Sequence, residues 1–199
     1  MRRAIQLLMP VAVVFLLFGC LDSSTTVTIR SDGSGLLTLE YVIERVVFET
    51  GVFNSDGLLP IPVAEDDFVN ATTSVDGIAL RRYRLTEDDD TVTVRATITF
   101  DTTDALVTFL GDDWISIVAS GDTTTWRQLL VPARSGAEGS AYLAEDLDQY
   151  TLRFEIDPDE PITSVQGGTL LRNGDAAVAE VSLGAIVRGA QAQYLEVVW

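Results

Sequence analysis

Few side chains in this sequence are suited to catalysis. The sequence contains no histidine and no lysine, and Cys20 is its only cysteine. Histidine, lysine and thiolate groups supply most general bases and nucleophiles near neutral pH, so serine–histidine catalysis is excluded. Carboxylate chemistry remains formally possible, but it needs two carboxylates that face each other across a cleft, and no spacing here predicts such a pair. We therefore expect a protein that is not an enzyme.

Three acidic clusters contain oxygen atoms that could bind calcium. They are Glu65–Asp67, Glu87–Asp90 and Asp157–Glu160. None has the Asp-x-Asp-x-Asp-Gly spacing of a calcium loop. A helix N-terminus, a solvated hairpin turn and a proline turn explain the three clusters better, so we expect no metal site and no dissociable cofactor.

Cys20 lies at the end of a segment that resembles an export signal. Arg2–Arg3 precede the mostly apolar run Ala4–Phe18, and Gly19 follows it. This order of positive, apolar and small residues is that of a signal peptide. A spanning helix needs about 20 predominantly apolar residues. The run is shorter and is followed by Asp22, which favours cleavage over a retained membrane span.

The residues around this expected cleavage point resemble the lipobox of bacterial prolipoproteins. The three positions before Cys20 hold Leu17, Phe18 and Gly19. The resemblance implies that a lipoprotein signal peptidase recognises these three residues and removes residues 1–19. It also implies a diacylglyceryl group on the Cys20 thiol and an acyl chain on its freed amine. The alternative is an ordinary secretory peptide, or an uncleaved anchor, in which Cys20 is incidental.

Acylation of Cys20 would fix where the protein is found. Each buried methylene contributes about 0.8 kcal/mol, so two or three chains would hold the protein almost permanently at a membrane. We expect a lipid-anchored protein of the cell envelope. Leu21, rather than aspartate, follows the cysteine. In Gram-negative systems this resembles lipoproteins sorted to the outer membrane, so we expect the outer membrane or the periplasmic face in such an organism.

The composition limits the possible partners. The formal net charge is −17, and every basic residue is arginine. Nucleic-acid binding depends on lysine and arginine that neutralise phosphates, so we expect no nucleic-acid partner. The acidic, lysine-free composition fits either a saline habitat or a GC-rich genome. With a single cysteine, no intramolecular disulfide can form.

The hydropathy pattern after the signal peptide predicts an α+β domain of antiparallel β-hairpins with short helices packed on the sheet. We expect residues 20–26 to be the acylated cysteine with a short tether, and 27–199 to be the domain, with two units of about 27–111 and 112–199 left open. Expected strands lie within 27–43 and at 78–85, 91–100, 114–118, 123–131, 152–156, 176–183 and 194–199, and expected helices at 63–68, 103–111 and 136–148. Residues 45–55 fit helix or loop, and 57–62 fit a proline-bounded linker.

Two tryptophans are candidates for a ligand groove. Trp114 and Trp126 lie in neighbouring predicted strands, and aromatic side chains often line the walls of such grooves. Packing in the core is the alternative explanation and the one that we favour.

From Thr26 to about Gly111 the chain is similar to the LppM-type lipoprotein domain of mycobacterial and other bacterial surface lipoproteins. Besides Cys20, the similarity rests on Ser31–Gly35 with Leu39–Ile43, on Leu59–Pro60 before an acidic helix, and on Asp76–Ile78 at a strand start. The resemblance implies an α+β domain with an apolar groove for a lipid or glycolipid. The chain departs from members with a C-terminal transmembrane helix, because it ends in a strand-like run.

These observations leave two hypotheses about function. The first is a non-catalytic envelope lipoprotein that binds a lipid or another apolar ligand. The alternative is a structural module that contacts partner proteins of the envelope through an exposed apolar patch.

The anchor can be tested by intact mass of the protein purified from its native membrane. We expect the chain to begin at Cys20 and to be heavier than its sequence by the mass of its acyl chains. Cys20→Ser should remove that mass and release the protein from the membrane fraction. Retention of residues 1–19, or an unmodified Cys20, would contradict the lipobox interpretation.

Overall fold

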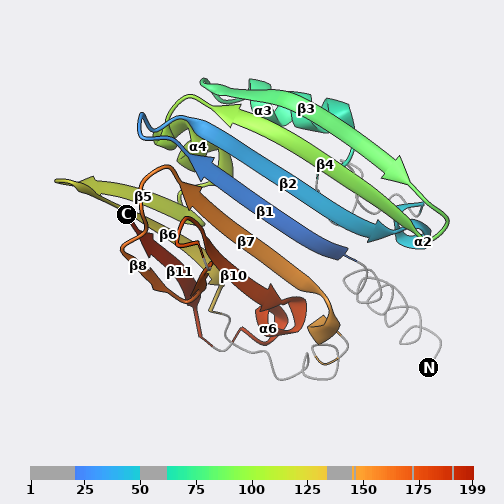
Figure 1. The fold of residues 1–199 in the computed structure, drawn as a ribbon. Coiled ribbons are helices and arrows are strands. Elements are labelled where there is room, and N and C mark those ends of the chain that lie inside the picture. The colour runs from blue at the N-terminus through green and yellow to red at the C-terminus, as the bar shows by residue number, and fades with distance from the viewer. Residues whose placement is uncertain (1–20, 50–61, 134–144, 146, 172, 190) are drawn as a thin grey trace.

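The computed structural model describes residues 21–49, 62–133, 145, 147–171, 173–189 and 191–199. Two β-sheets account for most of these residues (Figure 1). The larger sheet has seven strands, in the spatial order β3 (Ile78–Glu87), β4 (Thr91–Phe100), β2 (Gly35–Glu44), β1 (Leu21–Ile29), β7 (Thr151–Pro158), β10 (Ala177–Ser182) and β9 (Thr169–Leu170). The fold class is α+β, as predicted.

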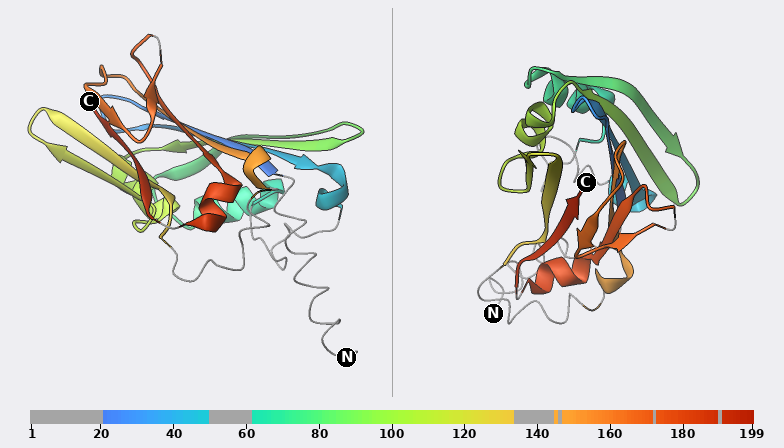
Figure 2. Two further views of the ribbon diagram at one scale, coloured as in Figure 1. Left: turned by 90° about the horizontal axis from the view of Figure 1, so that it is seen from below. Right: turned by 60° about the vertical axis from the view of Figure 1, so that its left-hand side comes forward.

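The smaller sheet and the helices lie on one side of the larger sheet (Figure 2). The four strands of the smaller sheet follow the order β5 (Ile115–Ser120), β6 (Thr123–Val131), β11 (Gln193–Val198) and β8 (Ser164–Gln166). The helices are α2 (Arg45–Phe48), α3 (Glu65–Thr73), α4 (Thr103–Leu110), the 3-10 helix η2 (Leu147–Gln149) and α6 (Leu183–Arg188). We call the side of the larger sheet that faces them its inner face.

Strand β1 occupies the middle of the larger sheet. It pairs antiparallel with β2 over its whole length, from Leu21 to Ile29. On its other side it pairs with β7 from Ser23 onward, and this pairing is parallel. The antiparallel prediction therefore fails at one pair of strands. Because β7 and β10 come from the second half of the chain, residues on both sides of position 112 contribute to one sheet.

The expected tether at 20–26 is wrong from Leu21 onward, because β1 begins there. The run of Ser and Thr at positions 23–26 resembles a linker in composition. Threonine is β-branched, however, and suits a strand whose backbone is hydrogen-bonded to strands on both sides. Cys20 and the signal peptide lie outside the described residues.

One continuous core joins the two sheets and the helices. Val27 and Leu37 of the larger sheet and Trp126 and Leu195 of the smaller sheet belong to it, each at most 1% exposed. Burying an aliphatic side chain such as that of Val27, Leu37 or Leu195 contributes about 1.5–3 kcal/mol to the free energy of unfolding. At the β3 edge of the larger sheet, Phe68 of α3 packs against Tyr83, with ring centroids 5.9 Å apart.

Most predicted elements are confirmed, some with longer bounds. Both early hairpins form, as β1–β2 and β3–β4, and β5, β6, β7, β10 and β11 lie where strands are expected. Helices α3 and α4 are confirmed, and Thr102 caps α4 by accepting a hydrogen bond from the Ala105 backbone N–H. In the open segment 45–55, α2 forms at its start, and residues 50–55 lie outside the described residues.

Some observed elements are not predicted from the sequence, and some predicted elements lie outside the described residues. The short strands β8 and β9 and the helix α6 are not predicted from the sequence. Most of the expected helix at 136–148 lies outside the described residues, as do positions 57–61, and η2 begins at Leu147. Within the described part of the chain, no helix is both long and apolar enough to cross a membrane.

The β1–β2 hairpin allows a test at Gly35. An added Cβ at this position would collide with the Thr28 carbonyl oxygen and with the ring of Phe100. Because the carbonyl oxygen and the ring both belong to a packed sheet, we expect Gly35→Ala to lower the free energy of unfolding in urea by about 1–3 kcal/mol. Ser116→Ala, at an exposed strand position, is the control and should change it by less than about 0.5 kcal/mol. Equal stability of the two variants would contradict the described packing.

Candidate functional site

The exposure of side chains on the inner face of the larger sheet differs between the two ends of β1. In the half remote from Leu21, inward side chains such as Val27, Leu37 and Ile156 are at most 1% exposed. In the half next to Leu21, Ile43 of β2 is fully buried as well, but six inward side chains of the same three central strands, two on each strand, stay partly exposed. We call these six residues the proximal inner face: Ser23, Thr25, Leu39, Tyr41, Leu152 and Phe154.

Side-chain size varies systematically across the proximal inner face. Ser23 of β1 lies opposite Tyr41 of β2 and Leu152 of β7. One inward position further, Thr25 lies opposite Leu39 and Phe154. The sheet therefore has a low strip of small hydroxyl side chains along β1, between two rows of large apolar side chains. Leu39, Tyr41, Leu152 and Phe154 also pack against the buried core.

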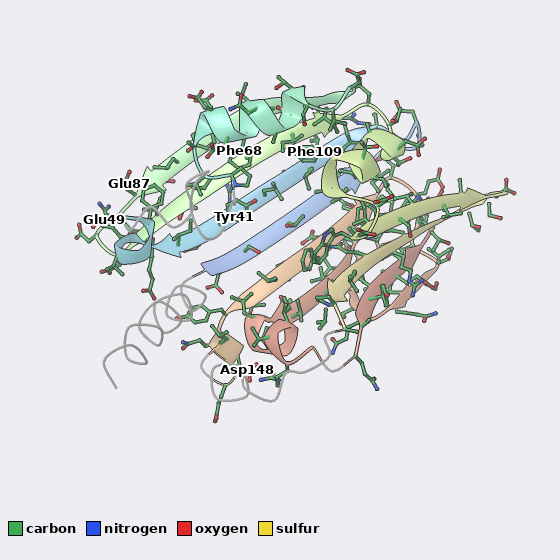
Figure 3. The ribbon with its side chains drawn as sticks, turned by 180° about the vertical axis from the view of Figure 1, so that it is seen from behind. Tyr41, Glu49, Phe68, Glu87, Phe109 and Asp148 are labelled. Carbon is green, nitrogen blue, oxygen red and sulfur yellow. The ribbon has the colours of Figure 1, made fainter. Side chains whose placement is uncertain are left out.

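Tyr41 is the most distinctive polar group of this face. Its ring lies on the same side of the sheet as Phe68 and Phe109 of the covering helices (Figure 3). Burial raises the pKa of Tyr41 to about 12. Its hydroxyl makes no hydrogen bond with a described residue. By contrast, the Tyr83 hydroxyl donates to the Val63 carbonyl oxygen at 2.8 Å. The Tyr41 hydroxyl is therefore largely removed from water and, among the described residues, lacks the kind of partner that Tyr83 has.

The structure does not bring the two candidate tryptophans together. Trp126 is only 1% exposed and belongs to the core. It shares the inner side of the smaller sheet with Ile117, its register partner on β5. Trp114 lies in the turn directly before the buried Ile115, the first residue of β5, and is 51% exposed. Core packing, the alternative explanation, accounts for Trp126 alone.

The residues expected around the cleavage point, Leu17, Phe18, Gly19 and Cys20, lie outside the described residues. Leu21 is the first described position and already pairs with Ile43. The proximal inner face thus begins at the end of the sheet that follows Cys20 directly.

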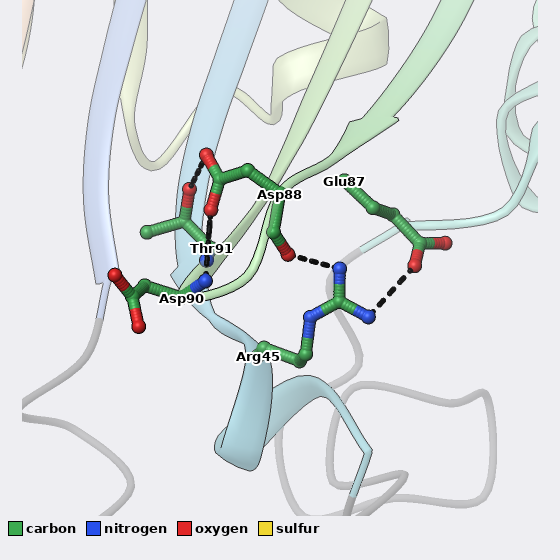
Figure 4. A network of polar contacts seen from close by, with 5 residues as sticks. All are labelled: Arg45, Glu87, Asp88, Asp90 and Thr91. Atoms are coloured by element: carbon green, nitrogen blue, oxygen red, sulfur yellow. Dashed lines mark hydrogen bonds and ion pairs between the residues drawn. The ribbon is translucent and has the colours of Figure 1, made fainter.

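The acidic turn at Glu87–Asp90 is held by its own hydrogen bonds (Figure 4). The Asp88 carboxylate accepts from the Thr91 backbone N–H at 2.7 Å and from that of Asp90 at 2.9 Å. These bonds, first of all that from Thr91, hold the pKa of Asp88 below its usual value. Arg45 of α2 donates to the Asp88 carbonyl oxygen and lies 3.3 Å from Glu87. The cluster closes a hairpin and joins it to α2.

The acidic start of α3 has a similar structural role. The Asp67 carboxylate accepts hydrogen bonds from the backbone N–H groups of Val63 and Ala64, at 3.2 and 3.0 Å. Acidic side chains in a first turn also interact favourably with the helix dipole. Among the described residues, no group of three or more acidic, histidine or cysteine side chains is placed to hold a metal ion.

A surface recess of about 630 Å³ borders β7, β9 and β10. Its lining includes Arg153, Thr169 and Glu180. Arg153 is paired with Glu155 at 2.9 Å and with Glu180 at 2.8 Å, so its charge is already compensated. The recess therefore offers an anion little attraction.

Comparison with known proteins identifies the fold. No family model and no curated protein matches the sequence. A solved structure that is similar is the NMR structure of the folded domain of LppM from Mycobacterium tuberculosis, at 12% sequence identity and a TM-score of 0.53. The similarity covers 90% of this chain and 88% of that one. The chain therefore has the fold of the LppM domain over nearly its whole length.

The environment of Tyr41 can be tested by alkaline titration. Its pKa of about 12 lies above the ordinary value of 10.0, so the folded state holds the phenol proton more tightly than the unfolded state does. The associated stabilisation is complete below about pH 10 and is lost as the pH rises toward 12. We expect Tyr41→Phe to remove the last tyrosinate absorbance step before alkaline unfolding. Loss of a step near the ordinary tyrosine pKa instead would contradict the desolvation of this hydroxyl.

Proposed function

We propose that this protein is a non-catalytic lipoprotein of the bacterial cell envelope, anchored by acyl chains on Cys20, and that its proximal inner face binds an acyl chain of a lipid. The observation that carries the proposal is the partial exposure of large apolar side chains in the middle of the sheet. Leu39, Tyr41, Leu152 and Phe154 would be fully covered in a closed core, as their neighbours in the other half are.

The chemistry of the face suits a hydrocarbon chain. The two rows beside β1 are apolar, and the face contains no charged side chain. Each methylene removed from water contributes about 0.8 kcal/mol, so ten buried methylenes would contribute about 8 kcal/mol before the entropic cost of ordering the chain. The low strip along β1 gives such a chain a place between the two apolar rows.

Hydroxyl groups on the same face would position a polar part of the lipid. Ser23 and Tyr41 lie opposite each other on β1 and β2, and neither hydroxyl bonds to a described residue. A hydroxyl both donates and accepts. The pair therefore suits an ester carbonyl or a lipid hydroxyl group at the end of the acyl chain.

The position of the anchor brings the ligand close. A strand rises about 3.3 Å per residue, so Ser23 is about 10 Å from Cys20 along the chain. With Cys20 acylated, the proximal inner face would begin at the membrane surface. A lipid leaving that membrane would meet the apolar rows without crossing a long aqueous path.

The proposal is tested by lipid extraction from matched variants. Thr25→Phe fills the low strip between Leu39 and Phe154, whereas Thr26→Phe places the same ring on the outer face of the same strand. We expect the processed wild-type protein and Thr26→Phe to retain extractable, non-covalent lipid after purification in detergent. Thr25→Phe should retain less than about a tenth as much, with an unchanged covalent mass at Cys20.

Circular dichroism and thermal unfolding provide the control for folding. If all three proteins fold and carry equal amounts of non-covalent lipid, the proximal inner face is not the binding site. If the wild type carries none, the alternative of a module that contacts partner proteins is favoured, while the mass of Cys20 still decides the anchor independently.

A further inference from the structure

The outer face of the smaller sheet carries an exposed aromatic row. Trp114 is 51% exposed and Tyr194 is 39% exposed. The Leu129 backbone N–H donates to the Trp114 carbonyl oxygen at 2.8 Å, and Leu129 is the register partner of Tyr194. Trp114, in the turn immediately before β5, thus lies in line with Leu129 of β6 and Tyr194 of β11. At about 4.8 Å per strand, the two aromatic positions are about 10 Å apart.

Polar side chains with free hydrogen-bonding groups form the next row of the same face. Ser116, Arg127 and Glu196 are register partners on β5, β6 and β11. The Arg127 guanidinium lies 4.0 Å from the centroid of the Tyr194 ring. Within the described part of the chain, neither Arg127 nor Glu196 forms an ion pair or a hydrogen bond. The face therefore combines an aromatic surface with a donor and an acceptor one row away.

We propose that this face binds a neutral glycan. A pyranose ring has an apolar C–H face that can stack on the exposed indole of Trp114. Its rim of hydroxyl groups would then reach the row of Arg127 and Glu196, where one side chain donates and the other accepts. Tyr194, held by its contact with Arg127, would contact the adjoining sugar about 10 Å along the row.

Charge and area favour this ligand over other partners. A net charge of −17 repels polyanions, and locally the charges of Arg127 and Glu196 cancel. Stable protein interfaces bury about 800 Å² per partner, whereas aromatic side chains contribute about 150–250 Å² each when fully buried. Even with Val118, which is exposed two positions beyond Ser116 on the same face, these partly exposed side chains provide too small an apolar area for such an interface.

The proposal does not depend on lipid binding, because the aromatic row and the proximal inner face lie on different sheets. The smaller sheet also lies toward the end of β1 that is remote from Leu21 (Figures 1 and 2). If Cys20 holds the protein at a membrane, the aromatic row would therefore face the glycans of the envelope rather than the bilayer.

The test is fluorescence titration of the processed full-length protein in detergent with tetrasaccharides of chitin, cellulose and mannan. We expect at least one of them to change the tryptophan emission and to bind at least about tenfold more weakly to Trp114→Ala. Calorimetry gives the affinity of that variant independently of its lost fluorophore. Val118→Ala, which removes another exposed apolar side chain of the same sheet (58% exposed), should bind as the wild type does.

Three outcomes would overturn the proposal. They are the absence of binding to all three tetrasaccharides, equal affinity of Trp114→Ala and the wild type, and equal weakening by Trp114→Ala and Val118→Ala. A change in oligomeric state caused by Trp114→Ala, measured by sedimentation, together with no glycan binding, would assign the row to contact between copies of this chain.

Discussion

The pairing of β1 on both sides is the constraint on which the rest of the structure depends. Because β1 bonds to β2 over its whole length and to β7 from Ser23 onward, the residue after Cys20 is already fixed in the middle of a seven-stranded sheet. The same pairing joins the two halves of the chain, since β7 comes from the second half. It leaves almost no tether, so acylation at Cys20 would set both the orientation of the sheet and its distance from a membrane.

The contrast between the two halves of the inner face follows from the sequence of β1. Val27 and Ile29 bring the remote half into the shared core with Trp126 and Leu195 of the smaller sheet. Ser23 and Thr25 occupy equivalent inward positions nearer Cys20, where a closed core would have larger apolar side chains. Local departures from the rules that stabilise a fold are expected where function requires them. This departure lies beside the proposed anchor.

Local patterns in the sequence were sufficient to predict much of the fold. Alternating residues in β2 and β4 predict the early hairpins, because hairpin partners are close in sequence, and the apolar side formed by Leu106, Val107, Phe109 and Leu110 predicts α4. The parallel β1–β7 pair joins positions more than a hundred residues apart, and no local periodicity encodes it. The composition around Thr25 predicts a tether, although the residue lies in β1. The exposure of Trp114 and the burial of Trp126 could be distinguished only once the register of β5 and β6 was known.

Photochemical crosslinking tests the central claim most directly. Cells that express the protein would be grown with a fatty acid that carries a diazirine, irradiated, and the crosslinked residues of the purified protein identified by mass spectrometry. The account predicts crosslinks at Leu39 and Tyr41 of β2 and at Leu152 and Phe154 of β7, which flank the low strip along β1. Crosslinks confined to other surfaces, or none at all, would contradict the binding of an acyl chain at the proximal inner face.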